Sequence, residues 1–317
     1  MFNRNNELLK THGGLFVLTA LVLILPLFVS SSFQLRVLVI VWVYALAAIG
    51  LNLLMGFAGQ VSMGHGGFFA IGAYACALGP TQLGLPPALS LPAGVVVAAL
   101  IAFVVGRPIL RLKGHYLAVA TLGFGILVFM ALSNEVQVTG GPDGMPVKRL
   151  ELFGWKLRGS TTWYWVTGGM MILGAWVAFN IVNSPTGLAL RALRDSEVVA
   201  PVMGIDVARY KLLVFVLSAA YAAAAGGALA LFDGYVTPGM SDFLVSVQLV
   251  TMVVLGGMGS ILGSVIGAAL LVALPQFLTS LHDYEHAMLG LIMMLTIIFL
   301  RQGIVPTLTK ALFGKRS

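Results

Sequence analysis

The sequence predicts an all-α integral membrane protein, a polytopic helical bundle with about ten transmembrane helices. Of its 317 residues, 59% are hydrophobic and only 9% are charged, whereas a typical soluble domain is about 25% charged. Apolar runs recur along the whole chain, and its composition does not change from one part to the next. We therefore expect one transmembrane domain over residues 1–317. The single cysteine, Cys76, excludes an intramolecular disulfide.

Ten apolar runs approach the length of about 20 residues that a membrane-spanning helix needs. The third, eighth and ninth are short or broken by glycine. No small-x-small cleavage site follows the first run, so we interpret it as a retained helix and not as a signal peptide. The runs cover residues 15–32, 35–55, 61–79, 88–110, 116–133, 163–182, 211–232, 243–257, 260–278 and 286–301.

The distribution of basic residues orients these spans. With the N-terminus inside, the inner segments are residues 1–14, 107–115, 183–211 and 301–317. They hold two, three, four and four basic residues, which is 13 of the 18 in the chain. Because cytoplasmic loops of membrane proteins are enriched in Lys and Arg, we expect both termini to be cytoplasmic. A long loop, residues 134–162, is then external.

Two Gly-rich segments stand out, Gly56–Gly79 and Val253–Pro275. In the second, Gly259, Gly263 and Gly267 recur every four residues. This spacing predicts a helix face of nearly bare backbone, on which another helix packs closely. The two segments lie in opposite halves of the chain, each after an apolar span, which is typical of internally duplicated transporters.

The first Gly-rich segment is the candidate substrate path. Its glycines are too dense for an unbroken helix, because Gly costs about 1 kcal/mol relative to Ala in a helix interior. Irregular backbone at membrane depth is tolerated only where protein or a water-filled path covers it. The candidate path residues are Gln60, Ser62, His65, Gly66, Gly67 and Tyr74.

His65 has two interpretations, a packing and hydrogen-bonding role or a place in the lining of the path. We expect no metal site there, since no carboxylate, thiol or second imidazole lies near it in sequence. A predicted external turn holds residues of ligand type, and we interpret it as a solvated loop: His282, Asp283, Glu285 and His286. Residues 61–79 and 243–278 contain no ionisable Asp, Glu, Lys or Arg, which argues against a proton- or sodium-driven carrier.

The charged segment, residues 183–211, is rich in both charge signs and lies between two nearly apolar blocks. A long charged segment in so apolar a chain indicates contact with a partner in the aqueous phase. We therefore predict a docking element for a partner protein. The alternative is an interfacial helix that rests on lipid headgroups. The charged residues are Arg191, Arg194, Asp195, Glu197, Asp206, Arg209 and Lys211.

Local signals predict how the charged segment begins and ends. Ser184 or Thr186 can cap a helix that has Pro185 near its first turn. Pro201 removes a helical donor, so the helix should stop or kink there. Gly204 can close the segment.

We further expect Asp206 to cap the following membrane helix. The helix in the charged segment should be amphipathic, with its apolar face against the bundle and its charged face toward the partner. The expected bundle face holds Leu188, Ala192 and Val199, and the expected partner face holds Arg194, Asp195 and Glu197.

Six stretches carry a family resemblance. They are GLNLLMGFAGQVSMGHGGFFAIGAY (Gly50–Tyr74), LRLKGHYLAVATLGFG (Leu110–Gly125), TGGPDG (Thr139–Gly144), GLALRALRDSEVVAPVMGIDVARYKL (Gly187–Leu212), VVLGGMGSILGSVIGA (Val253–Ala268) and LRQGIVP (Leu300–Pro306). In their order and spacing they resemble the permease family of branched-chain amino acid ABC importers, in particular its LivM-like subunit. There are two departures. Ile126 stands where an acidic residue is expected in many relatives, and Arg301-Gln302-Gly303 is shorter than the usual Arg-Pro-x-Gly.

The resemblance implies a multi-pass protein of the bacterial inner membrane that moves branched-chain or related hydrophobic amino acids by alternating access. It also implies a heterodimer with a second, paralogous permease subunit, two cytoplasmic ATPase subunits and a periplasmic substrate-binding protein. Nucleic acid is not implied as a partner. Gly187–Gly204 would be the coupling segment that sits in a groove of an ATPase subunit. The coupling residues would be Gly187, Arg191, Arg194, Asp195, Glu197 and Gly204.

Hydrolysis of ATP is not expected in this chain, which we interpret as a transport subunit and not an enzyme. Gly314-Lys315 is the sole Gly-Lys pair, and Thr309 stands where a phosphate-binding loop needs glycine. We therefore expect no cofactor here, with ATP and Mg on the partner ATPase subunits. Two alternatives stay open. One is an importer of the same class for urea, a short amide or another small organic solute, and the other is a stand-alone channel or secondary carrier.

Overall fold

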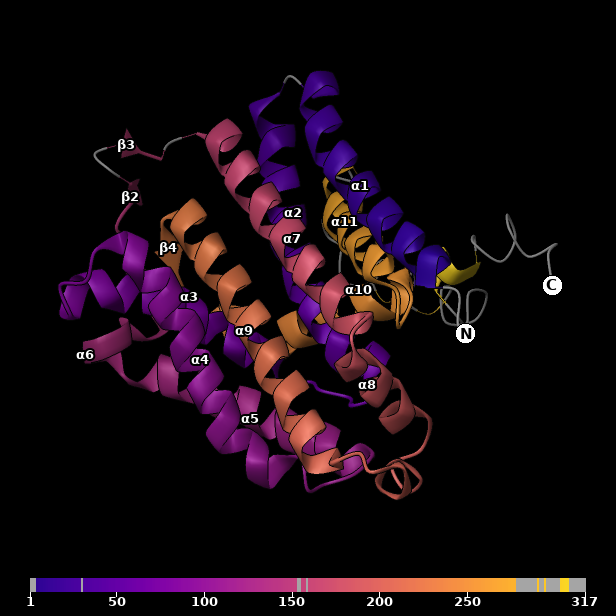
Figure 1. Cartoon of the computed structure of the whole chain (residues 1–317). Coiled ribbons are helices and arrows are strands. Elements are labelled where there is room, and N and C mark those ends of the chain that lie inside the picture. Colours follow the sequence, from indigo (N-terminus) through magenta and orange to yellow (C-terminus); the bar gives the residue numbers. More distant parts are fainter. Residues whose placement is uncertain are drawn as a thin grey trace.

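Long helices dominate the computed structural model, which describes residues 4–29, 31–152, 155–157, 159–277, 290, 294 and 303–307 (Figure 1). The all-α class predicted from the composition is therefore confirmed. The α-helices are α1 (Arg4–Phe28), α2 (Ser32–Asn52), α3 (His65–Gln82), α4 (Pro87–Ile109), α5 (His115–Asn134), α6 (Val136–Thr139), α7 (Ser160–Val182), α8 (Pro185–Asp195), α9 (Val207–Asp233), α10 (Phe243–Gly256) and α11 (Ile261–Phe277).

Short elements connect these helices. Strand β1 (Met145–Pro146) pairs antiparallel with β4 (Tyr235–Val236), and β2 (Glu151–Leu152) pairs antiparallel with β3 (Trp155–Lys156). A π-helix continues α2 over Leu53–Phe57. Three 3-10 turns span Gly141–Asp143, Ala200–Met203 and Pro238–Ser241.

Five helical segments in the described part of the chain are long and apolar enough to cross a membrane. They are α2 with its π-helical extension, α4, α5, α7 and α9. Three shorter apolar helical segments accompany them, Gly13–Phe28, Phe243–Gly256 and Ile261–Pro275. These helices make the chain a multi-pass membrane protein. Nearly all of the tenth predicted span, 286–301, and the whole turn at residues 282–286 lie outside the described residues.

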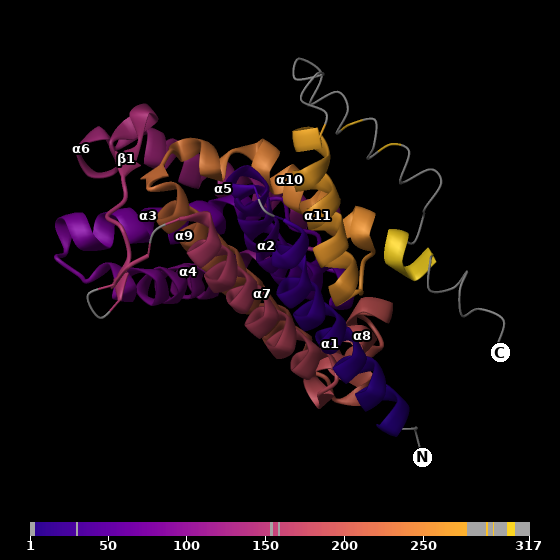
Figure 2. The same cartoon turned by 90° about the horizontal axis from the view of Figure 1, so that it is seen from above.

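Helix α9 lies at the centre of the bundle and packs closely on α3 and on α2. Small residues permit this approach. A Cβ added at Gly72 would overlap the backbone of Ala223, and one at Gly226 would overlap the backbone of Phe69. Without water to drive helices together, close contact of this kind is how membrane helices associate. Around this centre, α4 covers α3 and α9, while α7 and α11 pack on α2 (Figure 2).

Several boundaries differ from those predicted. Helix α3 begins at His65 and not at residue 61, because residues 58–64 form an irregular link after the π-helix. Helix α1 begins at Arg4, so it extends into the polar N-terminal residues. The two long polar connections lie at opposite ends of the bundle. Helix α8 is at one end, and strands β1–β4 are at the other (Figure 1).

Candidate functional site

The charged segment begins with α8, a short helix placed against the end of α7. Pro185 occupies its first turn as predicted, but the Ser184 hydroxyl donates to the Ile181 oxygen at 2.7 Å and does not cap α8. Gly187 allows the close approach, because a Cβ there would overlap the Val182 backbone. The buried residues of α8 are Gly187, Ala189, Leu190 and Leu193.

Helix α8 ends at Asp195 and not at Pro201, which corrects the predicted boundary. Ser196 is extended, and its hydroxyl accepts a hydrogen bond from the Val199 N–H at 3.2 Å. Short polar side chains that bond to nearby backbone in this way compete with a helix. The break lets Glu197 turn inward, and the chain then forms the separate turn Ala200–Met203.

The end of the charged segment is built as the sequence predicts. Gly204 closes the turn Ala200–Met203 with φ of +77°, a left-handed conformation that favours glycine. The Asp206 carboxylate caps α9, since its Oδ1 accepts a hydrogen bond from the Arg209 N–H at 3.1 Å. Together these fix the direction in which the chain enters α9.

The predicted assignment of faces in the charged segment is correct for Asp195, which is exposed, but wrong for Leu188, Val199 and Glu197. Leu188 is 65% exposed and Val199 is 53% exposed, so neither lies against the bundle. Five apolar side chains instead project outward and form what we call the outer patch. Its members are Leu188, Val198, Val199, Val202 and Met203. The reason is that backbone oxygens and a buried lysine at this end of the bundle attract the charged side chains inward.

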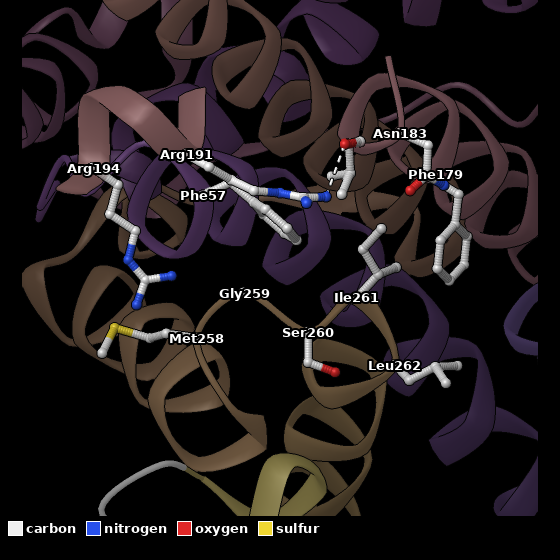
Figure 3. Close-up of a pocket in the computed structure, with 11 residues that line it drawn as sticks. Phe57, Phe179, Asn183, Arg191, Arg194, Met258, Gly259, Ser260, Ile261 and Leu262 are labelled. Carbon is white, nitrogen blue, oxygen red and sulfur yellow. Dashed lines mark hydrogen bonds between the residues drawn. The ribbon is translucent and has the colours of Figure 1, made fainter. Parts of the chain in front are cut away.

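Two arginines of α8 reach the bundle. The Arg191 guanidinium donates to the Val182 oxygen at 3.0 Å, and the Arg194 guanidinium donates to the Gly56 oxygen. Both line a cavity of about 490 Å³ between α8, the end of α7 and the start of α11, where Ser260 lies opposite them (Figure 3). These contacts satisfy backbone oxygens at helix ends, which otherwise lack intrahelical partners.

Glu197 is the most enclosed acidic group of the charged segment. Its Oε1 lies 2.6 Å from Lys211 Nζ and accepts a hydrogen bond from Gln60 Nε2 at 2.9 Å. The Lys211 side chain is only 3% exposed and that of Glu197 25%. Burial raises the pKa of Glu197, but hydrogen bonds from Lys211 and Gln60 outweigh it, so the pKa lies below its ordinary value. The carboxylate is therefore charged at neutral pH and links three segments.

Asp195 and Arg194 are both exposed at the end of α8, but only the Arg194 guanidinium reaches back to the bundle, where it donates to the Gly56 oxygen. Of the six predicted coupling residues, the structure therefore turns Arg191, Arg194 and Glu197 toward the bundle. Asp195 and Gly204 remain at the surface, and Gly187 is buried under α8.

Asn52 was not predicted as a functional residue, yet it joins the end of α2 to the second Gly-rich segment. Its Nδ2 donates to the Ser260 oxygen at 2.8 Å and to Ser264 Oγ at 2.7 Å, and its Oδ1 accepts from the Gly259 N–H at 2.9 Å. It is fully buried. The available signal was a lone amide inside an otherwise apolar span, since buried polar groups need partners.

The Gly-rich face of α11 is partly as predicted. A Cβ at Gly263 would lie 2.5 Å from the Gly256 oxygen, and one at Gly267 would overlap the Met252 oxygen. Both glycines thus face α10 at close range. Gly259 does not share that helix face, because it lies in the turn before α11 with φ of +81°.

The candidate path residues form a buried polar group at the start of α3. His65 Nδ1 is 2.8 Å from Ser62 Oγ, and His65 Nε2 is 2.6 Å from Ser218 Oγ on α9. Ser246 Oγ on α10 accepts a hydrogen bond from the Gly66 N–H at 2.9 Å. These contacts fit the packing and hydrogen-bonding interpretation of His65.

The substrate path stays a prediction. Gln60 and Tyr74 are buried, and the Tyr74 hydroxyl has no hydrogen-bond partner among the described residues. Gly67 packs beside Phe124 and Gly125 of α5. In the described part of the chain, no group of three or more His, Cys, Asp and Glu residues is arranged to hold a metal ion.

Comparison with known proteins assigns the family. A model of the branched-chain amino acid transport system permease component matches residues 33–299. The chain belongs to this permease family. Two curated relatives are the high-affinity branched-chain amino acid transport system permease proteins LivM of Salmonella typhimurium and of Escherichia coli. Each is 34% identical over 318 residues, covering 92% of this chain and 75% of the relative.

A second group of relatives has a different name within the same transport system. The permease is 27% identical over 287 residues to the branched-chain amino acid transport system permease protein LivH of Salmonella typhimurium, covering 83% of this chain and 91% of that protein. No solved structure matches the permease significantly. The sequence resemblance to this family is thereby confirmed, and the permease is more similar to LivM than to LivH.

Proposed function

We propose that this permease is a transmembrane subunit of an ATP-driven importer for branched-chain or related hydrophobic amino acids, working in the bacterial inner membrane. It pairs with a second, paralogous permease, receives substrate from a periplasmic binding protein and is driven by two cytoplasmic ATPase subunits. The family match supports this, since relatives named LivM and LivH are permease proteins of one kind of transport system.

The observation that carries the proposal is the outer patch of the charged segment. Arg191, Arg194 and Glu197 bond to the bundle, while the outer patch is displayed to the surroundings, with Val202 86% exposed and Met203 71% exposed. Contiguous exposed apolar side chains rimmed by polar ones mark protein or membrane contact sites. Because the family match makes this chain the permease component of a transport system, we assign the outer patch to contact with an ATPase subunit.

The same segment provides a route for movement into the bundle. Glu197 connects it to Lys211 at the start of α9 and to Gln60 in the link before α3. Arg194 connects it to Gly56 at the end of α2. A displacement of the segment by ATPase closure would act on three of the bundle's helices at once, which is what rocking between inward- and outward-facing states requires.

The topology we propose has ten spans and cytoplasmic termini, with the long loop outside. The basic residues support it, and so do the described helices. Helices α4 and α9 bring Arg107, Arg111, Arg209 and Lys211 to the end of the bundle that carries α8. Lys211 is buried, but it lies at the start of α9 and is paired with Glu197. Its charge is therefore held at the end of the helix that meets water.

The proposed function is tested by purification and uptake. With all subunits expressed together, an affinity tag on the permease should recover the second permease and the ATPase, and cells should take up labelled leucine. Replacing the phosphate-binding lysine of the ATPase is a matched control, because assembly should persist while uptake stops. Uptake that continues after deletion of every partner ATPase would contradict the proposal.

A further inference from the structure

A basic cavity lies between the end of α4 and the start of α9, and none of the roles described above uses it. Its volume is about 1000 Å³. Five cationic side chains line it, against the carboxylates of Glu197 and Asp206. The cations are Arg107, Arg111, Lys113, Arg209 and Lys211.

Most of this positive charge is not neutralised within the chain. Lys211 is paired with Glu197, but the other four cations are exposed and have no ion pair with a carboxylate in the part of the chain that the structure describes. With five cations against the two carboxylates of Glu197 and Asp206, the lining keeps a formal net charge of +3. The cavity is thus complementary to an anion that supplies several oxygen acceptors, and arginine binds phosphate oxygens through two N–H groups at once.

The apolar surroundings of the cavity indicate what carries that anion. Phe103 lines the cavity and packs beneath the Arg107 guanidinium, 4.3 Å from the ring centroid to the guanidinium carbon. The surface continues up α4 with Leu100 and Val104, which are 59% and 67% exposed. An apolar helix face that ends in a basic cavity at the membrane boundary matches one kind of molecule, an acyl chain with a phosphate headgroup.

We propose that this cavity binds the headgroup of an anionic phospholipid, with its acyl chains along the exposed face of α4. Arg107, Arg111, Lys113 and Arg209 contact the phosphate oxygens. The cavity also contains Pro201 and Asp206 of the charged segment. A bound lipid therefore touches the segment that we assign to the ATPase contact and stabilises its position relative to α4.

The test measures lipid binding to the assembled, delipidated importer by native mass spectrometry, using phosphatidylglycerol and phosphatidylcholine with identical acyl chains. We expect phosphatidylglycerol to bind more tightly. Arg111→Gln should weaken it about fivefold, since one basic residue near a membrane surface contributes about that much, and should leave phosphatidylcholine unchanged. Lys113→Gln is a second variant with the same expectation.

Arg149→Gln is the matched control, because Arg149 is an exposed arginine on the long loop at the opposite end of the bundle. Equal binding of the two lipids, or equal loss in Arg111→Gln and Arg149→Gln, would overturn the proposal. Two further outcomes would also overturn it. In one, inorganic phosphate binds the importer in an Arg111-dependent way but phosphatidylglycerol does not. In the other, the isolated permease pair binds phosphatidylglycerol but loses it when the ATPases assemble, which means that the ATPases cover the cavity.

Discussion

The two long polar connections of this permease differ in how many apolar side chains they expose. In the long loop, Val147 and Leu150 are buried, Asp143 and Arg149 face outward, and two large apolar side chains among the described residues are exposed, Val136 and Val138. In the charged segment, Glu197 and Arg191 bond to the bundle while the five side chains of the outer patch face outward. The more numerous exposed apolar side chains are the reason why we assign a partner to the charged segment and not to the long loop.

The means of attachment differ as well. The long loop is held by pairing of β1 with β4, by the Tyr235 hydroxyl, which donates to the Asp143 oxygen at 2.6 Å, and by Lys148 Nζ, which donates to the Pro80 oxygen at 2.8 Å. The charged segment is held by long side chains that end in ionic or charge-assisted bonds. Charge-assisted bonds are roughly twice as strong as neutral ones. They hold a segment that a partner must be able to move without unfolding it.

The largest expected effect comes from placing a charge in the outer patch. Val202→Asp buries an unpaired carboxylate if the patch contacts an ATPase, and it should weaken ATPase association by about 4 kcal/mol, roughly a thousandfold. Co-purification at defined salt measures this. Val136→Asp is the control, since Val136 is 61% exposed at the opposite end, and it should leave association unchanged. If the two variants lose ATPase association equally, the charged segment is no more a docking surface than the long loop, and the assignment of the outer patch is contradicted.

The second prediction concerns the ion pair under the charged segment. Glu197→Gln leaves the buried Lys211 cation without its carboxylate and should lower the free energy of unfolding by about 3 kcal/mol. Thermal unfolding of the permease checks this. The double variant Glu197→Gln and Lys211→Met should recover most of the loss. If the double variant is no more stable than Glu197→Gln alone, the pair does not act as a unit.

The exposed ion pair at the other end supplies its control. Arg36 and Asp233 lie 3.0 Å apart, with side chains 58% and 28% exposed. Asp233→Asn should therefore cost less than about 1 kcal/mol.

The pH dependence of stability follows from the pKa of Glu197. Because this pKa in the folded state is below the ordinary value of 4.5, the stabilisation by the Glu197 carboxylate is complete above pH 4.5. It is lost as the pH falls through the lower, folded-state pKa, so stability should not vary with Glu197 ionisation near neutral pH.

The third prediction alters the close contact between α10 and α11. Gly263→Ala places a Cβ 2.5 Å from the Gly256 oxygen, so α10 and α11 must separate, and we expect a loss of about 2 kcal/mol. Gly169→Ala in α7 is the control, because nothing lies within 4 Å of its added Cβ. A fully stable Gly263→Ala permease in the same unfolding assay would contradict the close packing.

The smallest effect is expected in the long loop. Tyr235→Phe removes the hydrogen bond to the Asp143 oxygen and should cost about 1 kcal/mol, with no change in ATPase association. A loss of association in this variant would show that the long loop also influences docking. Unfolding and co-purification on the same preparation distinguish the two results.

Hydropathy and caps predicted the helices well because a membrane span needs length and apolarity, which are local properties. The cap by Asp206 and the turn at Gly204 also follow from local chemistry. Which apolar residues of α8 face the bundle could not be predicted in this way. They are Ala189, Leu190 and Leu193 and not Leu188. The apolar pattern also contains no information on the oxygens and the lysine that draw Arg194 and Glu197 inward.

Long-range partners were likewise outside the reach of local patterns. Glu197 meets Gln60, and Asn52 meets Ser264, only because the bundle brings distant helices together. Resemblance to the family implied a coupling stretch at Gly187–Gly204 but not its inner and outer sides. The structure supplies that division, and we propose the function of the outer patch from it.

The most direct test of the outer patch is its protection by the ATPase. In a permease carrying Val202→Cys, with the native Cys76 buried, a water-soluble maleimide should label the new thiol when the ATPases are stripped and fail to label it in the assembled importer. Val136→Cys should be labelled in both states. Labelling of Val202→Cys at the same rate with and without the ATPases would contradict the assignment of the patch as their contact.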